Sequence, residues 1–78
     1  MGKLALKEGA LLQLLNWELA AYQETAGCHF TAVRPVPPGA EANWMDAQLE
    51  ADHPMGAMEH FIAGQVVAET RRVFDLAS

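Results

Sequence analysis

The fold is decided by residues 28–50, CHFTAVRPVPPGAEANWMDAQLE, a proline-broken segment that lies between two stretches of helical periodicity. Residues 29–34 are rich in β-forming side chains, and the prolines and glycine that follow end the run. Asn43–Glu50 alternates between apolar and polar residues, which indicates a second, half-buried strand. We therefore expect an antiparallel β-hairpin with a proline-rich connection.

The alternation also assigns the side chains of this hairpin to two faces. The inward set is expected to comprise Phe30, Ala32, Met45, Ala47 and Leu49. Val33 and Trp44 then fall on the outer face, among polar residues. Because a two-stranded sheet with a valine and a tryptophan outward is only marginally stable alone, we expect another surface to cover this face.

Residues 10–24 place apolar side chains at helical intervals, which predicts an amphipathic helix ending before Gly27. Its core face is expected to hold Leu11, Leu12, Leu15, Leu19 and Tyr22. A second apolar strip consists of Ala10, Leu14, Trp17 and Ala21. One small hairpin cannot cover both strips. We therefore predict an interaction surface made of Leu14, Trp17, Ala21, Val33 and Trp44.

Glu18 lies between the two apolar strips of this helix. A carboxylate there is costly to bury without a partner, so we expect it to meet Arg34, a backbone N–H or a hydroxyl group. The alternative favoured by residue statistics is a rim glutamate that reaches water. A catalytic acid with a raised pKa would need a second convergent group, and the sequence indicates none.

The second helix is expected to begin at Asp52-His53-Pro54, with Pro54 at the first helical position. Its core face keeps helical spacing over more than three turns and comprises Ile62, Ala63, Val66, Val67, Thr70, Val73 and Phe74. Met55, Met58 and Phe61 lie near the outer side of its start. Such residues can form an adaptable binding surface, but gap-filling in the core is the more frequent use and is our interpretation.

The composition limits the classes of function. A chain of 78 residues has room for one domain, expected over residues 10–78 after a flexible or partly helical segment 1–9. The 10 Asp and Glu outnumber the 5 Lys and Arg, which form no basic cluster, so we expect no nucleic-acid partner. The single cysteine favours a reducing cytoplasm, and no apolar run is long enough to span a membrane.

The three histidines raise the question of a metal site. His53 and His60 are seven positions apart, whereas helical ligand pairs normally lie three or four apart, and no second cysteine could complete a tetrahedral site. Cys28 and His29 are adjacent on a strand and point to opposite faces, so they cannot act as nucleophile and base. The sequence carries no phosphate-binding or hydrolase motif. We therefore expect no enzyme, no metal and no cofactor.

Several short segments together resemble a known group of proteins. They are Leu14–Leu19 (LLNWEL), Gly27–Phe30 (GCHF), Arg34 with Pro37, Asn43–Trp44, Ala47 with Leu49, and Val66–Arg72 (VVAETRR). This pattern is similar to that of short uncharacterised proteobacterial proteins. The resemblance implies a bacterial, cytoplasmic, single-domain protein and no particular activity. Members of the group often have further cysteines near the positions of Ala42 and Ala51, and their absence here weakens any shared metal or redox role.

These patterns predict an α+β domain of order αββα, with two helices packed on one face of the hairpin. The leading hypothesis for function is a protein–protein interaction module, acting as a homodimer or an accessory subunit. The alternative is a small-ligand or metal-binding protein that uses His29, His53 and His60. An acidic inhibitor that mimics nucleic acid is the third possibility.

Overall fold

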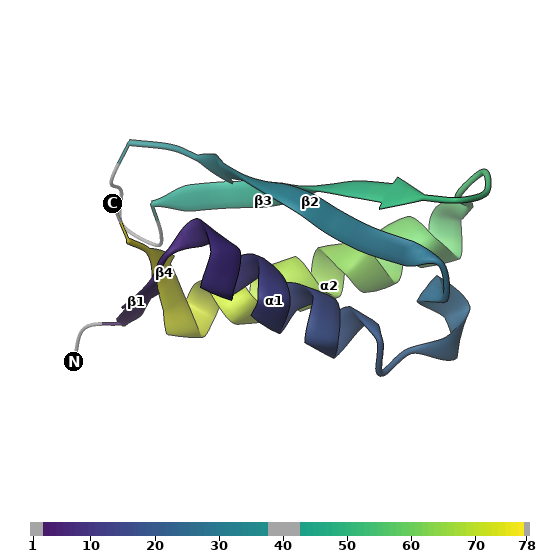
Figure 1. The fold of residues 1–78 in the computed structure, drawn as a ribbon, viewed down its shortest axis with the longest axis horizontal. Coiled ribbons are helices and arrows are strands. Elements are labelled where there is room, and N and C mark those ends of the chain that lie inside the picture. The colour runs from purple at the N-terminus through teal and green to yellow at the C-terminus, as the bar shows by residue number, and fades with distance from the viewer. Residues whose placement is uncertain (1–2, 38–42, 78) are drawn as a thin grey trace.

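The computed structural model describes residues 3–37 and 43–77 and shows an α+β domain (Figure 1). Its helices and strands follow in the order β1 (Leu4–Leu6), α1 (Glu8–Leu19), a 3₁₀ turn (Gln23–Thr25), β2 (Cys28–Pro35), β3 (Trp44–Ala51), α2 (Ala57–Val73) and β4 (Phe74–Leu76). The predicted hairpin is present as the antiparallel pair β2–β3. The predicted αββα order lacks the short strands β1 and β4, one of which lies within the segment expected to be flexible or partly helical.

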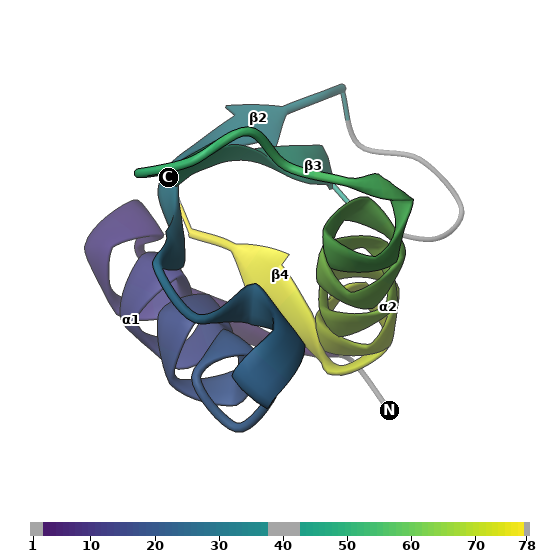
Figure 2. The same cartoon turned by 90° about the vertical axis from the view of Figure 1, so that its right-hand side faces the viewer.

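The hairpin forms one layer of the domain, and both helices lie on the same side of it (Figures 1 and 2). Helix α1 contacts β2, helix α2 contacts β3, and the two helices contact each other. Strands β1 and β4 form a separate parallel pair, with Leu4 opposite Phe74. The core between the layers is made of Leu11, Leu15, Leu19, Phe30, Val33, Trp44, Ile62, Ala63, Val66 and Val67.

The predicted faces of the hairpin are partly wrong. Trp44 is completely buried and Val33 is 5% exposed, whereas Met45, expected inside, is 52% exposed. The cause is two β-bulges. Thr31 of β2 has no register partner on β3, and Met45 of β3 has no register partner on β2. Each extra residue reverses the alternation of side chains along its strand. Val33 and Trp44 therefore do not belong to an exposed interaction surface.

Polar contacts at one end of the domain fix Trp44 and the strand β4. The indole Nε1 of Trp44 donates to the Phe74 carbonyl at 3.0 Å, and the Trp44 carbonyl accepts from Arg71 Nε at 2.9 Å. The Asn43 side chain accepts the Leu76 N–H at 2.8 Å and donates to the Leu76 carbonyl at 2.6 Å. Asn43 thus gives β4 the donor and acceptor that a neighbouring strand would provide.

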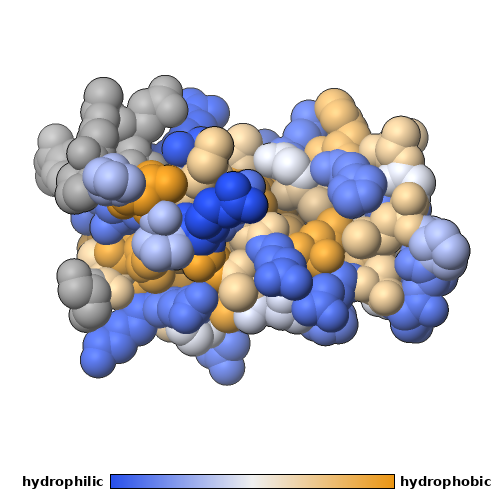
Figure 3. Space-filling view, turned by 90° about the horizontal axis from the view of Figure 1, so that it is seen from above, coloured by the Kyte–Doolittle hydropathy of each residue, from blue (hydrophilic) through white to orange (hydrophobic). Residues whose placement is uncertain are grey.

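With Trp44 and Val33 turned inward, the outer face of the hairpin shows hydrophilic side chains interspersed with apolar ones (Figure 3). Helix α1 ends at Leu19, so Tyr22, expected in the core, is 43% exposed. Helix α2 begins at Ala57, later than predicted. The side chains of Met58 and Phe61 are exposed, at 60% and 61%, so the interpretation of these two residues as part of the core is wrong. Within the described residues, neither helix has the length and hydropathy needed to cross a bilayer.

Glu18 meets a hydroxyl group, one of the three partners expected for it. Its Oε2 accepts a hydrogen bond from Thr70 Oγ1 at 2.6 Å, and Thr70 is only 3% exposed. We expect Glu18→Gln to be nearly neutral, because an amide oxygen still accepts this bond. Glu18→Leu should lower the free energy of unfolding by about 1–3 kcal/mol by leaving the buried hydroxyl unpaired. Urea unfolding measures both, and equal stability of the two variants would contradict the assignment.

Candidate metal centre

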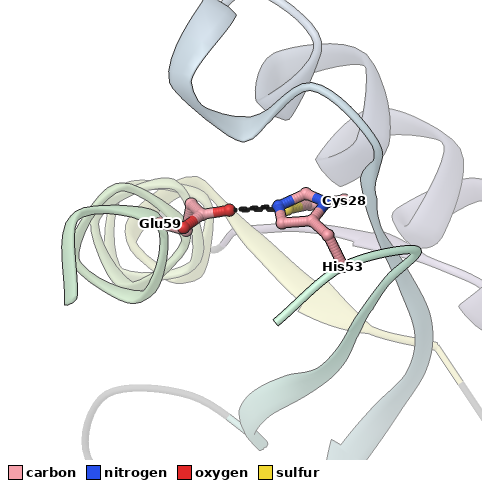
Figure 4. A group of neighbouring side chains, drawn as sticks. All are labelled: Cys28, His53 and Glu59. Carbon is pink, nitrogen blue, oxygen red and sulfur yellow. Dashed lines mark hydrogen bonds and ion pairs between the residues drawn. The ribbon is translucent and has the colours of Figure 1, made fainter. Parts of the chain in front are cut away.

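Three different donor atoms converge at the end of the hairpin that lies over the start of α2. They are Cys28 Sγ at the first residue of β2, His53 Nε2 in the β3–α2 connection, and Glu59 Oε2 in the first turn of α2 (Figure 4). All three atoms lie within 4.8 Å of one another. A thiol, an imidazole and a carboxylate are together the donor types that bind zinc in proteins.

Local backbone features place these side chains. Gly27 has a φ of 83°, which favours glycine, and it leads the chain into β2 so that Cys28 pairs with Ala51. A Cβ at Gly27 would lie 2.6 Å from Asp52 Oδ1, so the turn also makes room for that carboxylate. Glu59 is held at the start of α2 because its Oε1 accepts the Gly56 N–H at 2.7 Å.

The imidazole of His53 is held between two carboxylates. Its Nδ1 lies 2.7 Å from Asp52 Oδ1, and its Nε2 lies 2.5 Å from Glu59 Oε2. The hydrogen bonds to Asp52 and then to Glu59 raise the pKa of His53. The same contacts lower the pKa of Asp52, and the Gly56 N–H followed by His53 lowers that of Glu59. The doubly protonated form of His53, which has an N–H on each ring nitrogen, is the form that can donate to both carboxylates, and these contacts favour it.

Cys28 lies at the inner side of this cluster, with Sγ 3.9 Å from Glu59 Oε2. Burial, followed by the negative charge of Glu59, its hydrogen bond to the thiol and the charge of Asp52, raises the pKa of Cys28. The thiol is thus neutral at neutral pH and a poor nucleophile. A divalent cation would reverse this preference, because its charge stabilises the thiolate.

The spacing of the donors fits a small metal ion after a modest adjustment. Tetrahedral zinc, with bond lengths of about 2.0–2.3 Å, requires separations of roughly 3.4–3.6 Å between ligand atoms. The Cys28–Glu59 distance of 3.9 Å is close to this value. The His53–Glu59 distance of 2.5 Å is that of a hydrogen bond and must lengthen by about 1 Å when metal replaces the proton. Both side chains are at the surface or near it, where rotation about side-chain bonds can provide the change.

The outer contacts of these ligands are of the kind that supports metal sites. Asp52 accepts from His53 Nδ1 and so orients the ring with Nε2 toward Glu59, and the Gly56 N–H is donated to the other oxygen of Glu59. Three protein ligands leave one tetrahedral position for water or another molecule. The arrangement can therefore bind a transition metal in a site that stays accessible on one side.

Only one of the three histidines in the predicted alternative belongs to this cluster. His53 is part of it, whereas His29 is exposed opposite Glu50, and His60 is exposed one position beyond Glu59. The histidine set of the sequence analysis did not include Cys28 and Glu59, the other two members of the cluster. The signals were Gly27 at a tight turn before Cys28, and a glutamate three positions after Gly56, which indicates a helix cap.

The predicted interaction residues are not brought together as a single surface. Trp17 is 75% exposed and Ala21 is exposed, while Leu14 is half-buried. Val33 and Trp44 are buried in the core. Only Leu14, Trp17 and Ala21, on α1 and just after it, therefore remain candidates for an interaction surface.

Comparison with protein-family models, curated proteins and solved structures finds no match. The resemblance to short proteobacterial proteins stays a prediction. Of the two positions at which that group often has cysteines, Ala51 is the register partner of Cys28, and Ala42 lies outside the described residues.

Proposed function

We propose that this protein binds a divalent transition metal, with zinc the best fit, through Cys28, His53 and Glu59. The convergence of sulfur, nitrogen and oxygen donors from three separate segments carries the proposal. Softer donors favour zinc over magnesium or calcium, which prefer sites made only of oxygen. This is the metal-binding alternative of the sequence analysis with a different ligand set, and it includes no catalytic step.

The site is suited to exchangeable rather than permanent binding. The side chain of His53 is 39% exposed, and the three protein ligands leave one position for solvent. Protons compete with the metal for the ligand atoms, because the pKa values of both Cys28 and His53 are raised. Affinity should therefore increase with pH as these two groups lose their protons more readily.

Isothermal titration with zinc in reduced protein tests the proposal. We expect one zinc per chain and release of up to about two protons, measured by comparing buffers of different ionisation enthalpy. His53→Ala and Cys28→Ser should each weaken binding by about tenfold or more. His60→Ala and His29→Ala are matched controls and should bind as the unmodified protein does.

The competing explanation is that His53, Asp52 and Glu59 form only an ion-paired cluster that joins the hairpin to α2. That cluster needs no metal and no thiol. Zinc binding that is absent, or that His53→Ala and Cys28→Ser leave unchanged, would therefore reject the metal site. Cobalt provides a second readout, since coordination by the Cys28 thiolate gives a charge-transfer absorption that Cys28→Ser should remove.

Self-association is a second candidate function, favoured by the exposure of Trp17. A tryptophan that is 75% exposed, near the exposed Ala21 and the half-buried Leu14, leaves apolar surface on α1 uncovered. A twofold dimer through this helix would cover it on both copies. Because aromatic anchors at the centre of a contact often contribute more than about 2 kcal/mol, Trp17→Ala should shift a dimer to monomer.

Light scattering after size exclusion measures this shift. Tyr22→Ala is the matched control, because it removes another exposed aromatic residue outside the proposed contact. A monomer at concentrations of tens of micromolar would exclude the dimer without affecting the metal proposal, since the two use different residues.

A further inference from the structure

A second feature lies away from the metal centre, between β3 and α2. The two elements enclose an open groove of about 160 Å³, to which β2 adds one side chain. Its floor is apolar and includes Phe30, Ala47, Leu49, Ala63 and Val67. Cavities of roughly this volume can hold a benzene molecule, so the groove has room for one branched or aromatic side chain.

Strand β3 forms one wall of the groove and has a free edge. Within residues 3–37 and 43–77, β2 is the only strand that pairs with β3. A strand paired on one side presents unpaired N–H and C=O groups along the other, and these can pair with an added strand. Peptide-binding domains that use strand addition combine such an edge with a neighbouring groove for alternate side chains.

Helix α2 forms the other wall, and Gly64 is one of its lining residues. A Cβ built at Gly64 meets no atom within 4 Å, so neither a turn nor close packing requires glycine here. A larger side chain at this position would therefore have room to project into the groove, which makes Gly64 a suitable position for a variant that fills it.

The charges on β3 favour a basic partner. Asp46 lines the groove and Glu50 is exposed on the same strand, in a chain of net charge −5. Arg34 Nε lies 3.2 Å from Asp46 Oδ1, so these two charges form an ion pair. Among the described residues, Glu50 is then the carboxylate of β3 that is left without an ion-pair partner. Antiparallel pairing of two β3 strands about Gln48 would place Asp46 opposite Glu50, and facing like charges are destabilising. A second copy is thus a poorer occupant than a basic segment.

We propose that this groove binds an extended segment of another protein, which adds to the edge of β3 and alternates an apolar side chain with Lys or Arg. The apolar side chain enters the groove beside Gly64. The basic side chains lie near the carboxylates of β3. The proposal is independent of metal binding, because Cys28, His53 and Glu59 do not line the groove.

The test is a phage-displayed library of random peptides of about six residues, the usual length of a strand. It is selected against the zinc-treated protein and against the metal-free protein. We expect both to enrich peptides that alternate apolar and basic residues. A synthetic peptide of the enriched sequence should shift the amide NMR signals of β3 and of α2 around Gly64.

Two changes separate strand addition from general adhesion. Gly64→Leu fills the groove and should weaken peptide binding about tenfold or more, whereas Gly9→Leu, the matched change at an open position of α1, should not. N-methylation of alternate peptide amides should abolish binding by blocking the backbone bonds. No enrichment, acidic enriched peptides, or binding that survives Gly64→Leu overturns the proposal, and concentration-dependent self-association lost in Gly64→Leu assigns the groove to a second copy instead.

Discussion

Trp44→Ala is expected to remove a large part of the protein's free energy of unfolding. The side chain is completely buried and is the largest of the fully buried side chains. Removing a buried tryptophan typically costs about 3–5 kcal/mol. A domain of this size has a total stability of roughly 4–12 kcal/mol, so the loss is a large part of the whole. The change also removes the indole bond to the Phe74 carbonyl, which holds β4.

Circular dichroism and thermal melting measure this effect. Trp17→Ala, measured at a concentration where both proteins are monomeric, is the matched control, because the same substitution at a residue that is 75% exposed should change the stability of the monomer by less than about 0.5 kcal/mol. If Trp44→Ala instead left the free energy of unfolding unchanged and altered only the oligomeric state, the burial of Trp44 in the core would be contradicted and an outward-facing tryptophan would be supported.

Zinc is expected to raise the melting temperature by about 10–20 °C. A ligand at 100 times its dissociation constant stabilises the native state by about 2.7 kcal/mol, provided that it does not bind the unfolded chain. In a domain of this size, each kcal/mol added to the free energy of unfolding raises the melting temperature by about 4–8 °C. Differential scanning calorimetry with and without a chelator measures the shift, and Cys28→Ser provides the control that should lose it.

The pH dependence distinguishes zinc from the proton that it replaces. Without metal, the raised pKa of His53 contributes stability below its ordinary value of 6.5, which is lost as pH rises through the folded pKa. The lowered pKa values of Asp52 and Glu59 contribute above their ordinary values of 3.8 and 4.5, and that contribution is lost in acid. The stabilisation by zinc should change with pH in the opposite direction to the contribution of protonated His53, so it should grow as pH rises. A zinc effect that is constant with pH would contradict coordination by Cys28 and His53.

The sequence predicts the long elements because their periodicity is strong. Most of the two predicted helical core strips is buried as expected, namely Leu11, Leu15, Leu19, Ile62, Ala63, Val66, Val67 and Thr70, whereas Leu12 is only partly buried and Val73 is 53% exposed. The faces of the hairpin could not be predicted, because nothing in the local sequence shows where an extra residue enters a strand. The short strands β1 and β4 were also missed, since three residues are too few for a periodic pattern.

The candidate metal centre was only partly predictable for a related reason. His53 belonged to the predicted set of histidine ligands. The sequence argument for Cys28, however, used only its neighbour His29 and not the residues that the turn at Gly27 brings near it. Cys28 and Glu59 are 31 positions apart and come together through the hairpin. Such a contact depends on strand register, which the alternation alone placed wrongly.

The two bulges also affect how this hairpin can tolerate insertions and deletions. One extra residue on β2 shifts the pairing by one, and the extra residue on β3 restores it. Loss of Thr31 alone would remove the bulge on β2 and leave a regular pairing in which Val33 still faces the helices. Loss of Met45 alone would do the same on β3 and keep Trp44 inward. A gap well away from the two bulges would instead turn the following side chains to the opposite face. Single-residue gaps at Thr31 and Met45 are therefore expected to be better tolerated than gaps in the regular parts of the two strands.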